Sequence, residues 1–369
     1  MAGRGDGVKR LREGFSTGTA AAGAALAALT LLAEGRVPSE VFVPLPPFDD
    51  GSNLARLPVE QRSCRPESPS CAVAAVCKDG GDDPDVTSGA LIVARVNLTK
   101  GVCGDIRIDG GDGVGRVTLP GLPLPVGEAA INPVPREQMR IALRRYASEK
   151  NLSRQALSVV ISVPGGAKLA RRTLNPRLGI VGGISILGTQ GTVRPFSHEA
   201  WKATVRQGLN VALQTGCATV CLSTGRRSEA LLRRRYPELA PQAFIQAADF
   251  VSFSLKTAGV MPFAGIVWGC FFGKLLKLAQ GMENTHARKG DIDFERLADL
   301  CLRSGARCAD AVRAATTAAH ALDDIRADGR GQEVLLEIAA RAAARAAGFA
   351  GRPVRIHLFH PDGGLLCAA

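Results

Sequence analysis

The chain has 369 residues, 46% of them hydrophobic, which is enough to bury a large core over two domains and excludes a tail or a linker. Lys and Arg outnumber Asp and Glu by 46 to 34, a balance that favours anionic partners: nucleic acid, an acidic membrane surface or a polycarboxylate ligand. Because the chain has only two Trp and two Tyr and its basic residues are scattered, nucleic acid is the weakest of these choices.

The cysteines and the apolar stretches predict a soluble protein of a reducing cytoplasm. The ten Cys are irregularly spaced, form no CxxC pair and follow no secretory leader, so neither a disulfide framework nor a bound metal is expected. The longest apolar stretch, residues 20–33, is shorter than the roughly 18 residues that a membrane-spanning helix needs. We therefore expect no membrane partner.

The first part of the chain predicts an α+β domain over residues 1–150. Residues 14–35 are typical of a helix capped at Ser16 or Thr17 and ended by Gly35. Short β-type runs follow, separated by clusters of Gly, Asp and Pro, while the polar residues 49–69 predict a long surface loop. The predicted strands are 71–77, 90–97 and 103–108.

From residue 151 onward the pattern predicts a Rossmann-like α/β domain, residues 151–369, with a mostly parallel sheet covered by helices. A predicted helix over 137–149 ends the first domain, and after it strands, glycine-containing turns and helices alternate. The predicted strands are 157–163, 218–223, 265–268 and 354–359, and the predicted helices include 197–215, 228–236, 271–280 and 331–347. Ligands are expected at the carboxyl ends of these strands.

Residues 78–87, KDGGDDPDVT, concentrate four carboxylates in one turn. Turn formation explains the Gly, Asp and Pro residues but does not require so many carboxylates. Their mutual repulsion favours a cationic partner, such as Arg or Lys, a metal ion, a substrate amine or a sulfonium. A solvated acidic turn is the alternative.

Three glycine- and proline-rich segments are candidates for ligand contact. Residues 110–115, GGDGVG, supply backbone N–H groups that suit a carboxylate or phosphate, or form a tight β-turn. Residues 127–136, GEAAINPVPR, present Asn132 and Arg136, or act as a stiff linker. Residues 170–193 combine many Gly with cationic side chains, which favours a loop lying against a large ligand, an Ω-loop being the alternative.

Residues 273–281, GKLLKLAQG, place Lys274 and Lys277 on one face of a helix after a strand. The upstream glycine spacing does not match a phosphate-binding P-loop. In the following NTHARKGD segment, His286 has the side chain that titrates near neutral pH, although a lone His is more often structural than catalytic.

These segments together resemble the cobalt-precorrin-5B C1-methyltransferase family, from Leu11 to about Val312 and in the same order. The chain departs from the family at Ala20, where a Cys is common, at Gly80 for Ala and at Ala287 for Ser. The matching stretches are LREGFSTGTAAAGAA, KDGGDDPDVT, GDGVGRVTLPGLPLPVGEAAINPVPR, TLNPRLGIVGGISILGTQGTVRPFS and GKLLKLAQGMENTHARKGD.

The resemblance implies methyl transfer from S-adenosylmethionine to ring carbon C1 of cobalt-precorrin-5B, in anaerobic cobalamin biosynthesis. Cobalt is then part of a polycarboxylate tetrapyrrole substrate, which explains the basic charge. Under this hypothesis His286 and Asp83 are expected to be catalytic. The expected cofactor-binding residues are Asp82, Asp83, Asp85, Thr87, Gly113 and Gly115. The expected substrate-binding residues are Thr17, Thr19, Asn132, Arg171, Arg172, Asn175, Arg177, Gly182, Gly183, Thr189, Lys274 and Thr285.

Two other classes of function stay open from the sequence: a non-catalytic tetrapyrrole carrier and, less favoured, a nucleotide-dependent phosphotransferase. Thermal protection by ATP would support the phosphotransferase. Macrocycle binding without dependence on S-adenosylmethionine would support the carrier. The resemblance also leaves a homo-oligomer open.

Overall fold

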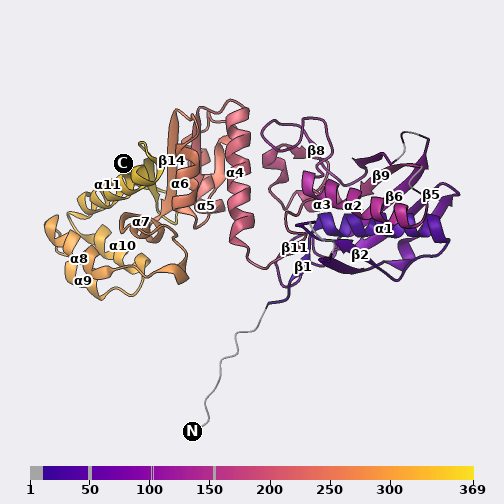
Figure 1. The fold of residues 1–369 in the computed structure, drawn as a ribbon. Coiled ribbons are helices and arrows are strands. Elements are labelled where there is room, and N and C mark those ends of the chain that lie inside the picture. The colour runs from indigo at the N-terminus through magenta and orange to yellow at the C-terminus, as the bar shows by residue number, and fades with distance from the viewer. Residues whose placement is uncertain (1–10, 49–51, 101, 103, 153–154) are drawn as a thin grey trace, which may run out of the picture. The chain divides into compact units, whose positions relative to one another are not determined.

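The structure, a computed structural model, describes residues 11–48, 52–100, 102, 104–152 and 155–369. The chain forms two compact units, Met1–Ser197 and His198–Ala369 (Figure 1). The division therefore lies after Ser197 and not near residue 150, which corrects the expected boundary. The physical reason is strand pairing, because β9 (Ala156–Ser162) pairs with β6 (Leu91–Thr99) and β7 (Ile106–Gly110) and so belongs to the first sheet.

The first unit is built on a five-stranded sheet of order β4-β5-β6-β9-β7. Its other strands are β4 (Arg65–Ser68) and β5 (Cys71–Cys77); neighbours run antiparallel except β7 and β9, which run parallel. The helices α1 (Thr17–Glu34) and α2 (Pro133–Glu149) pack against each other, and α1 covers β5 and β6. This arrangement agrees with a mixed α+β unit.

Helix α1 begins and ends where the sequence predicts. The Ser16 hydroxyl accepts a hydrogen bond from the Thr19 N–H at 3.1 Å. Gly35 adopts a left-handed conformation (φ 68°), and its N–H donates a hydrogen bond to the Leu31 carbonyl. Among the described residues, α1 is also the one helix long and apolar enough to cross a membrane, yet 83% of that window is buried. It packs as the core helix of the first unit.

Short strand pairs close the loops of the first unit. They are β1 (Gly14–Phe15) with β11 (Thr192–Val193), β8 (Arg116–Val117) with β10 (Ile180–Val181), and β2 (Glu40–Pro44) with β3 (Leu54–Pro58). The prediction of a loop over residues 49–69 is wrong for residues 52–69, because β3, the 3-10 turn Gln61–Ser63 and β4 occupy most of this segment. Residues 49–51 lie outside the described residues. The short helix α3 (Gly166–Ala170) and the 3-10 turn Asn175–Leu178 complete the unit.

The second unit holds a five-stranded sheet of order β13-β12-β14-β15-β16. The strands β12 (Thr219–Ser223), β13 (Phe244–Gln246), β14 (Gly265–Phe271) and β15 (Arg355–Phe359) run parallel, and β16 (Leu365–Ala368) pairs antiparallel with β15. The helices are α4 (His198–Gln214), α5 (Arg226–Arg235), α6 (Val251–Gly259), α7 (Phe272–Ala279), α8 (Phe294–Arg303), α9 (Ala309–Ala314), α10 (Ala318–Ala327) and α11 (Gly331–Ala350), with 3-10 turns at Pro241–Ala243 and Ala287–Lys289.

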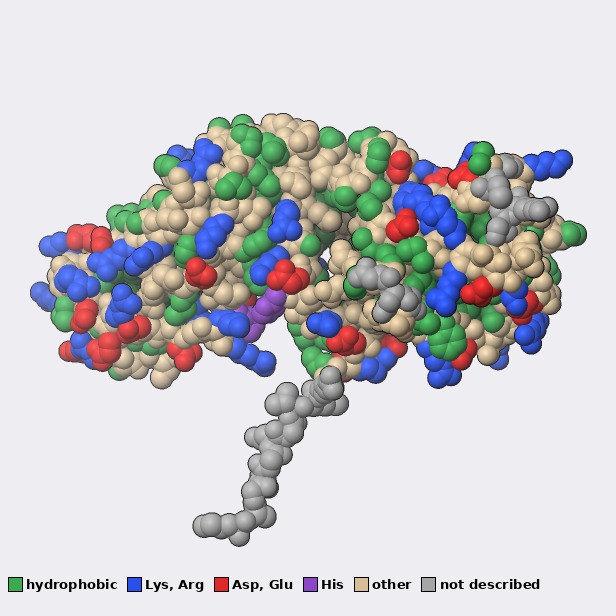
Figure 2. Space-filling model, in the orientation of Figure 1, with side chains coloured by type: hydrophobic (Ala, Val, Ile, Leu, Met, Phe, Trp, Pro, Cys, Tyr) green, Lys and Arg blue, Asp and Glu red, His purple; other side chains and the backbone are tan. Residues whose placement is uncertain are grey.

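Most of the strands and helices predicted for the second unit are present, and the elements that were not predicted are β13, β16, α6, α8, α9 and α10. The three-residue β13, the four-residue β16 and the six-residue α9 carry too little pattern to stand out. Helices α8 and α10 are as long as the predicted α5, and both carry buried apolar residues three and four positions apart. On the face seen in Figure 2, Lys and Arg side chains are interspersed with Asp and Glu.

His357 on β15 is a titratable side chain inside the second unit. It is 3% exposed, its Nε2 lies 2.7 Å from the Tyr236 hydroxyl, and its Nδ1 has no hydrogen-bond partner among the described residues. Burial, followed by the charges of Arg235 and Arg355, lowers the pKa of His357 to about 4. The neutral ring is therefore the form that fits the fold.

This depressed pKa predicts an acid-sensitive contribution to stability. The contribution is fully present above the unfolded pKa of about 6.5 and is lost as the pH falls toward 4, because the unfolded state binds the proton more readily. Between pH 7.5 and 4.5 we expect the wild type to lose about 2.5 kcal/mol more than His357→Gln, measured by urea unfolding at both pH values. Equal losses in the two proteins would show that His357 is not responsible.

Candidate functional site

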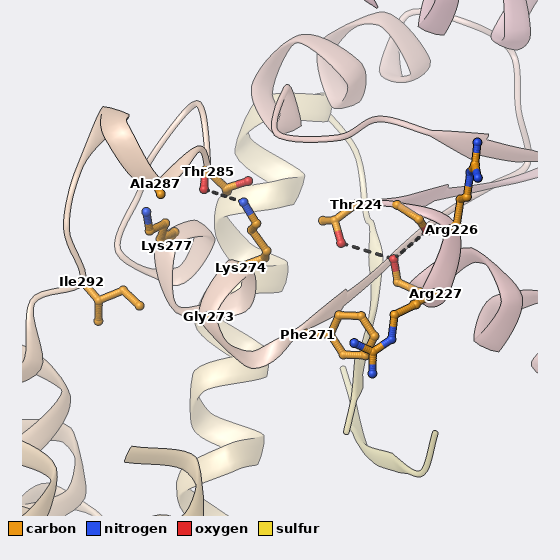
Figure 3. A pocket seen from close by; sticks show the side chains of 12 residues that line it. Thr224, Arg226, Arg227, Phe271, Gly273, Lys274, Lys277, Thr285, Ala287 and Ile292 are labelled. Atoms are coloured by element: carbon orange, nitrogen blue, oxygen red, sulfur yellow. Dashed lines mark hydrogen bonds between the residues drawn. The ribbon is translucent and has the colours of Figure 1, made fainter. Parts of the chain in front are cut away.

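A cavity of about 570 Å³ opens in the second unit, at the carboxyl ends of β12 and β14 (Figure 3). The loop after β12 and the start of α5 form one side, and the start of α7 with the segment after it forms the other. The lining residues are Thr224, Gly225, Arg226, Arg227, Ser228, Phe271, Gly273, Lys274, Lys277, Thr285, Ala287 and Ile292. This lining contains no Asp or Glu and four cationic side chains, so the cavity suits an anionic ligand.

The strand order explains why the cavity forms here. β12 and β14 are neighbours, but β13 lies beyond β12 and β15 beyond β14, so the chain leaves these two strands toward opposite edges of the sheet. Such a reversal separates the loops that follow the strands and leaves a crevice between them. The expectation of a ligand site at the carboxyl ends of the strands is therefore matched by a cavity.

Lys274 is held by groups of the protein itself. Its ammonium forms an ion pair with Asp249 and donates a hydrogen bond to the Thr285 carbonyl at 2.8 Å. The Thr285 hydroxyl donates to the same Asp249 carboxylate at 3.1 Å, and the Thr285 N–H donates to the Asp249 carbonyl. Lys274 and Thr285, both predicted as substrate-binding residues, thus line the cavity, and Asp249 already neutralises the lysine.

Lys277 lies one turn further along α7 and is 8% exposed. Its ammonium donates to the carbonyls of His286, at 3.3 Å, and Gly290, at 2.7 Å. Within the described part of the chain no carboxylate forms an ion pair with it, so this buried charge has neutral partners alone.

The opposite side of the cavity is formed by the start of α5. The Arg227 guanidinium lies over the Phe271 ring, 5.2 Å from its centroid, and donates to the Pro361 carbonyl at 2.8 Å. The Ser228 hydroxyl lies 3.2 Å from that of Thr224 and donates to the Gly225 carbonyl. Figure 3 shows Thr224, Arg227 and Phe271 on the other side of the cavity from Lys274 and Lys277.

His286 is exposed and stands between two lining residues. Its Nδ1 accepts a hydrogen bond from the Arg288 N–H at 3.1 Å and so caps the 3-10 turn Ala287–Lys289. A neutral ring that accepts at Nδ1 carries its proton on Nε2. This geometry suits a hydrogen-bond donor at Nε2, and the catalytic role expected of His286 stays a prediction.

The acidic turn lies in the first unit, and two of its four carboxylates are paired with cations of the chain. Asp85 accepts from the Lys78 ammonium at 2.7 Å and from the N–H and hydroxyl of Thr87, each at 2.8 Å. The Lys78 side chain is 1% exposed. Burial opposes ionisation of Asp85, but the charge of Lys78 and these hydrogen bonds outweigh it and lower the pKa of the carboxyl.

Asp79, Asp82 and Asp83 tie the turn to neighbouring segments. Asp79 pairs with the Arg12 guanidinium, whose hydrogen bond lowers the pKa of that carboxyl. One oxygen of Asp82 accepts from the Arg12 N–H at 2.7 Å, and one oxygen of Asp83 accepts from the Phe196 N–H at 3.0 Å. The second oxygens of Asp82 and Asp83 form no hydrogen bond within the described residues, whereas both oxygens of Asp85 are occupied.

The predicted glycine segments pack against each other backbone to backbone. A Cβ atom at Gly113 would lie 1.9 Å from the Val163 carbonyl oxygen, and one at Gly183 would lie 2.1 Å from the Gly113 carbonyl oxygen. A Cβ at Gly115 would meet Gly183 in the same way. These glycines therefore allow close packing, while the exposed Gly182 (φ +87) has nothing within 4 Å of such an atom.

The other predicted substrate residues lie in the first unit with differing surroundings. Thr17 bonds the backbone of Leu187 and Ser185, Thr19 bonds the Gly191 carbonyl, and Asn175 bonds the Gly183 carbonyl, so all three secure the loop that ends at β11. The remaining ones are the exposed Arg171, Arg172 and Thr189 and the half-buried Asn132 and Arg177.

Two family models match the chain: CbiD over residues 5–195, and CbiD, C-terminal domain, over residues 284–369. A Nitratidesulfovibrio vulgaris protein named cobalt-precorrin-5B C(1)-methyltransferase is 50% identical over 363 residues, covering 97% of this chain and 93% of that protein. The chain belongs to the CbiD family. The expectation drawn from the sequence motifs is thereby confirmed.

Further relatives and one solved structure extend the CbiD comparison. A Geobacillus kaustophilus protein of the same printed name is 46% identical over 91% of this chain and 88% of its own length. The crystal structure of an Archaeoglobus fulgidus cobalamin biosynthesis protein (cbiD) is 27% identical, with a TM-score of 0.39 and coverage of 74% of this chain and 81% of that one. Most of the cavity lies between the two matched segments of the CbiD models, on β12, β14 and their helices.

Sequence reasoning missed several cavity residues of this CbiD chain. Thr224, Arg226, Arg227 and Ser228 follow β12 in the stretch TGRRS, and the sequence pattern predicts no role for Lys277. A glycine and two arginines directly after a buried strand are the signal that would have found them, since helix N-termini at such positions attract anions.

Proposed function

We propose that the chain transfers a methyl group from S-adenosylmethionine to ring carbon C1 of cobalt-precorrin-5B and forms cobalt-precorrin-6A in anaerobic cobalamin biosynthesis. The observation that carries this proposal is the 50% identity, over nearly the full length of both chains, to a protein named cobalt-precorrin-5B C(1)-methyltransferase. The basic cavity supports it, because its cations suit the acetate and propionate arms of a tetrapyrrole.

We propose different ligands for the cavity lining of the second unit and for the acidic turn of the first unit. The cavity at the carboxyl ends of β12 and β14, used as in a Rossmann-like sheet, is proposed to bind substrate carboxylates. The free oxygens of Asp82 and Asp83 are proposed to bind the ammonium or ribose hydroxyls of S-adenosylmethionine. Asp85 and Thr87 then support this turn through internal hydrogen bonds, while Gly113 and Gly115, expected at the cofactor site, pack against other segments of the first unit.

Methyl transfer to carbon demands positioning more than acid–base chemistry. The electron pair of C1 forms the new C–C bond while the sulfonium S–C bond breaks and its electrons stay on sulfur, so S-adenosylhomocysteine leaves. The chain's part is to align these atoms and exclude water. We propose that His286 donates a hydrogen bond from Nε2 to a substrate oxygen. Further substrate carboxylates are proposed to contact Arg171, Arg172 and Arg177.

Replacing Asp83 by Asn tests the acidic turn. The amide keeps an oxygen for the Phe196 N–H but removes the charge that would attract an ammonium, so we expect the Kd for S-adenosylmethionine to rise roughly tenfold. Calorimetric titration measures this, and Glu67→Gln, which alters a carboxylate on β4 outside the turn, is the control. An unchanged Kd for Asp83→Asn would remove the residue from the cofactor site.

The setting of the proposed enzyme follows from its substrates. We propose that it acts in the cytoplasm on a small polycarboxylate macrocycle, with cobalt present as part of that substrate. Neither a nucleic acid nor a membrane is proposed as a partner, and a homo-oligomer is compatible with the proposal.

The deciding experiment is anaerobic incubation with cobalt-precorrin-5B and methyl-labelled S-adenosylmethionine, followed by mass spectrometry of the macrocycle. One labelled methyl at C1 is the expected result. Bound but unmethylated macrocycle would favour a carrier instead, and thermal protection by ATP without macrocycle binding would favour a phosphotransferase.

A further inference from the structure

The two lysines that line the cavity differ in their need for a ligand. Lys274 is neutralised by Asp249, and its ammonium also bonds the Thr285 carbonyl. Lys277 has two carbonyl partners and no carboxylate among the described residues. An external anion would therefore bind more favourably to Lys277 than to Lys274, although Lys274 is the lysine that the sequence predicts to bind substrate.

The burial of Lys277 makes this difference significant. A buried ammonium loses most of its hydration, and carbonyl dipoles replace only part of that loss. Two of its three N–H donors are used, which leaves one for a ligand oxygen. A bound anion would supply both the missing charge and the missing acceptor.

Features around Lys277 favour the same kind of ligand. Among the described residues no side chain caps the start of α5 after Gly225 or of α7 after Phe271, so neither helix start at the cavity has a side-chain acceptor of its own. Nothing lies within 4 Å of the position that a Cβ at Gly225 would take, so a ligand has room to approach that turn.

We infer that Lys277, together with the start of α5, binds a carboxylate arm of the macrocycle. This inference rests on the proposed function and names the ligand group of its cavity. The methionine carboxylate of S-adenosylmethionine is a second source of the same chemistry, but it carries an ammonium beside it. The cavity lining has no acidic residue, and the nearby Asp249 is already paired with Lys274, so an arm without an adjacent cation fits better.

The test compares the wild type with Lys277→Gln, which keeps a neutral donor for the two carbonyls, and with Lys277→Arg, which keeps the charge. Binding of cobyrinic acid, a cobalt corrin with free carboxylates, is measured by absorption titration. We expect Lys277→Gln to raise its Kd by roughly tenfold to a hundredfold and Lys277→Arg to recover most of the loss. Arg341→Gln, which removes an exposed charge paired with Glu337 on α11, is the matched control.

Three further measurements separate the outcomes. Cobinamide, whose arms are amides, should bind wild type and Lys277→Gln alike, and the Kd for S-adenosylmethionine should not change. A loss of affinity for S-adenosylmethionine alone, or no change for cobyrinic acid, would overturn the inference. Because Lys277→Gln removes an uncompensated buried charge, its unliganded melting temperature should not fall; a large fall with unchanged corrin binding would make Lys277 a structural residue.

This test does not depend on turnover. If corrin binding requires Lys277 but no methyl group is transferred, the inference stands and the proposed methyltransferase activity fails. If methyl transfer proceeds normally in Lys277→Gln with unchanged corrin affinity, the proposed function stands and the inference fails.

Discussion

Replacing Asp85 by Asn is expected to lower the free energy of unfolding of the first unit by about 3 to 5 kcal/mol. The Lys78 side chain is 1% exposed, and Asp85 is the carboxylate with which it forms an ion pair. The amide leaves that ammonium buried without a counter-charge and also loses one of the acceptor positions used by Thr87. Hydrogen exchange of the β5 and β6 amides, which report on this unit, measures the effect.

Two controls distinguish the loss of the Lys78–Asp85 ion pair from the loss of any negative charge in the turn. Asp82→Asn removes an exposed charge and keeps an acceptor for the Arg12 N–H, so it should cost less than about 1 kcal/mol. Adding Lys78→Met to Asp85→Asn should recover part of the loss, because no buried charge then remains. Similar losses in Asp82→Asn and Asp85→Asn would contradict a structural role specific to the buried pair.

Gly113→Ala is expected to cost more than about 3 kcal/mol or to prevent folding of the first unit. Its φ of +73 is unfavourable for a side chain by about 1 to 2 kcal/mol. The added Cβ would also lie 1.9 Å from the Val163 carbonyl oxygen, which the backbone must move to relieve. Yield of soluble protein and hydrogen exchange of β9 give the measurement.

The matched control is Gly182→Ala in the partner segment. Gly182 has a similar φ, +87, but no atom lies within 4 Å of the added Cβ. Its substitution should therefore cost only the conformational strain, about 1 kcal/mol. If the two alanine variants were equally stable, the close backbone packing at Gly113 would not be a determinant of the fold.

The sequence predicted those elements whose pattern is long and whose ends are marked. Helix α1 has a Ser cap, a long small-residue face and a closing Gly, and all three are observed. The domain boundary was placed too early because β9 follows a proline-rich segment and α2, as the first strand of a new domain would. Its pairing with β6 is a long-range choice that local pattern does not reveal.

The sequence predicted where in the second sheet a candidate site lies, but it predicted few of the residues that line the cavity. Strand and helix alternation located it at the carboxyl ends of the second sheet, and Lys274 and Thr285 line it. Sequence could not show that Asp249 neutralises Lys274, since the two are joined only by the fold. It likewise could not show that Asp85 forms an ion pair with the buried Lys78.

The pairing of β1 with β11 has a consequence for the protein's synthesis. Gly14 lies opposite Val193, and the hydroxyls of Thr17 and Thr19 bond carbonyls near residues 187 and 191. Because synthesis runs from the N-terminus to the C-terminus, residues 14–19 leave the ribosome long before residues 187–193, which are their native partners. The apolar face of α1 has its partners earlier, in β5, β6 and α2, so the start of the helix is the part that stays without its native hydrogen bonds during that interval.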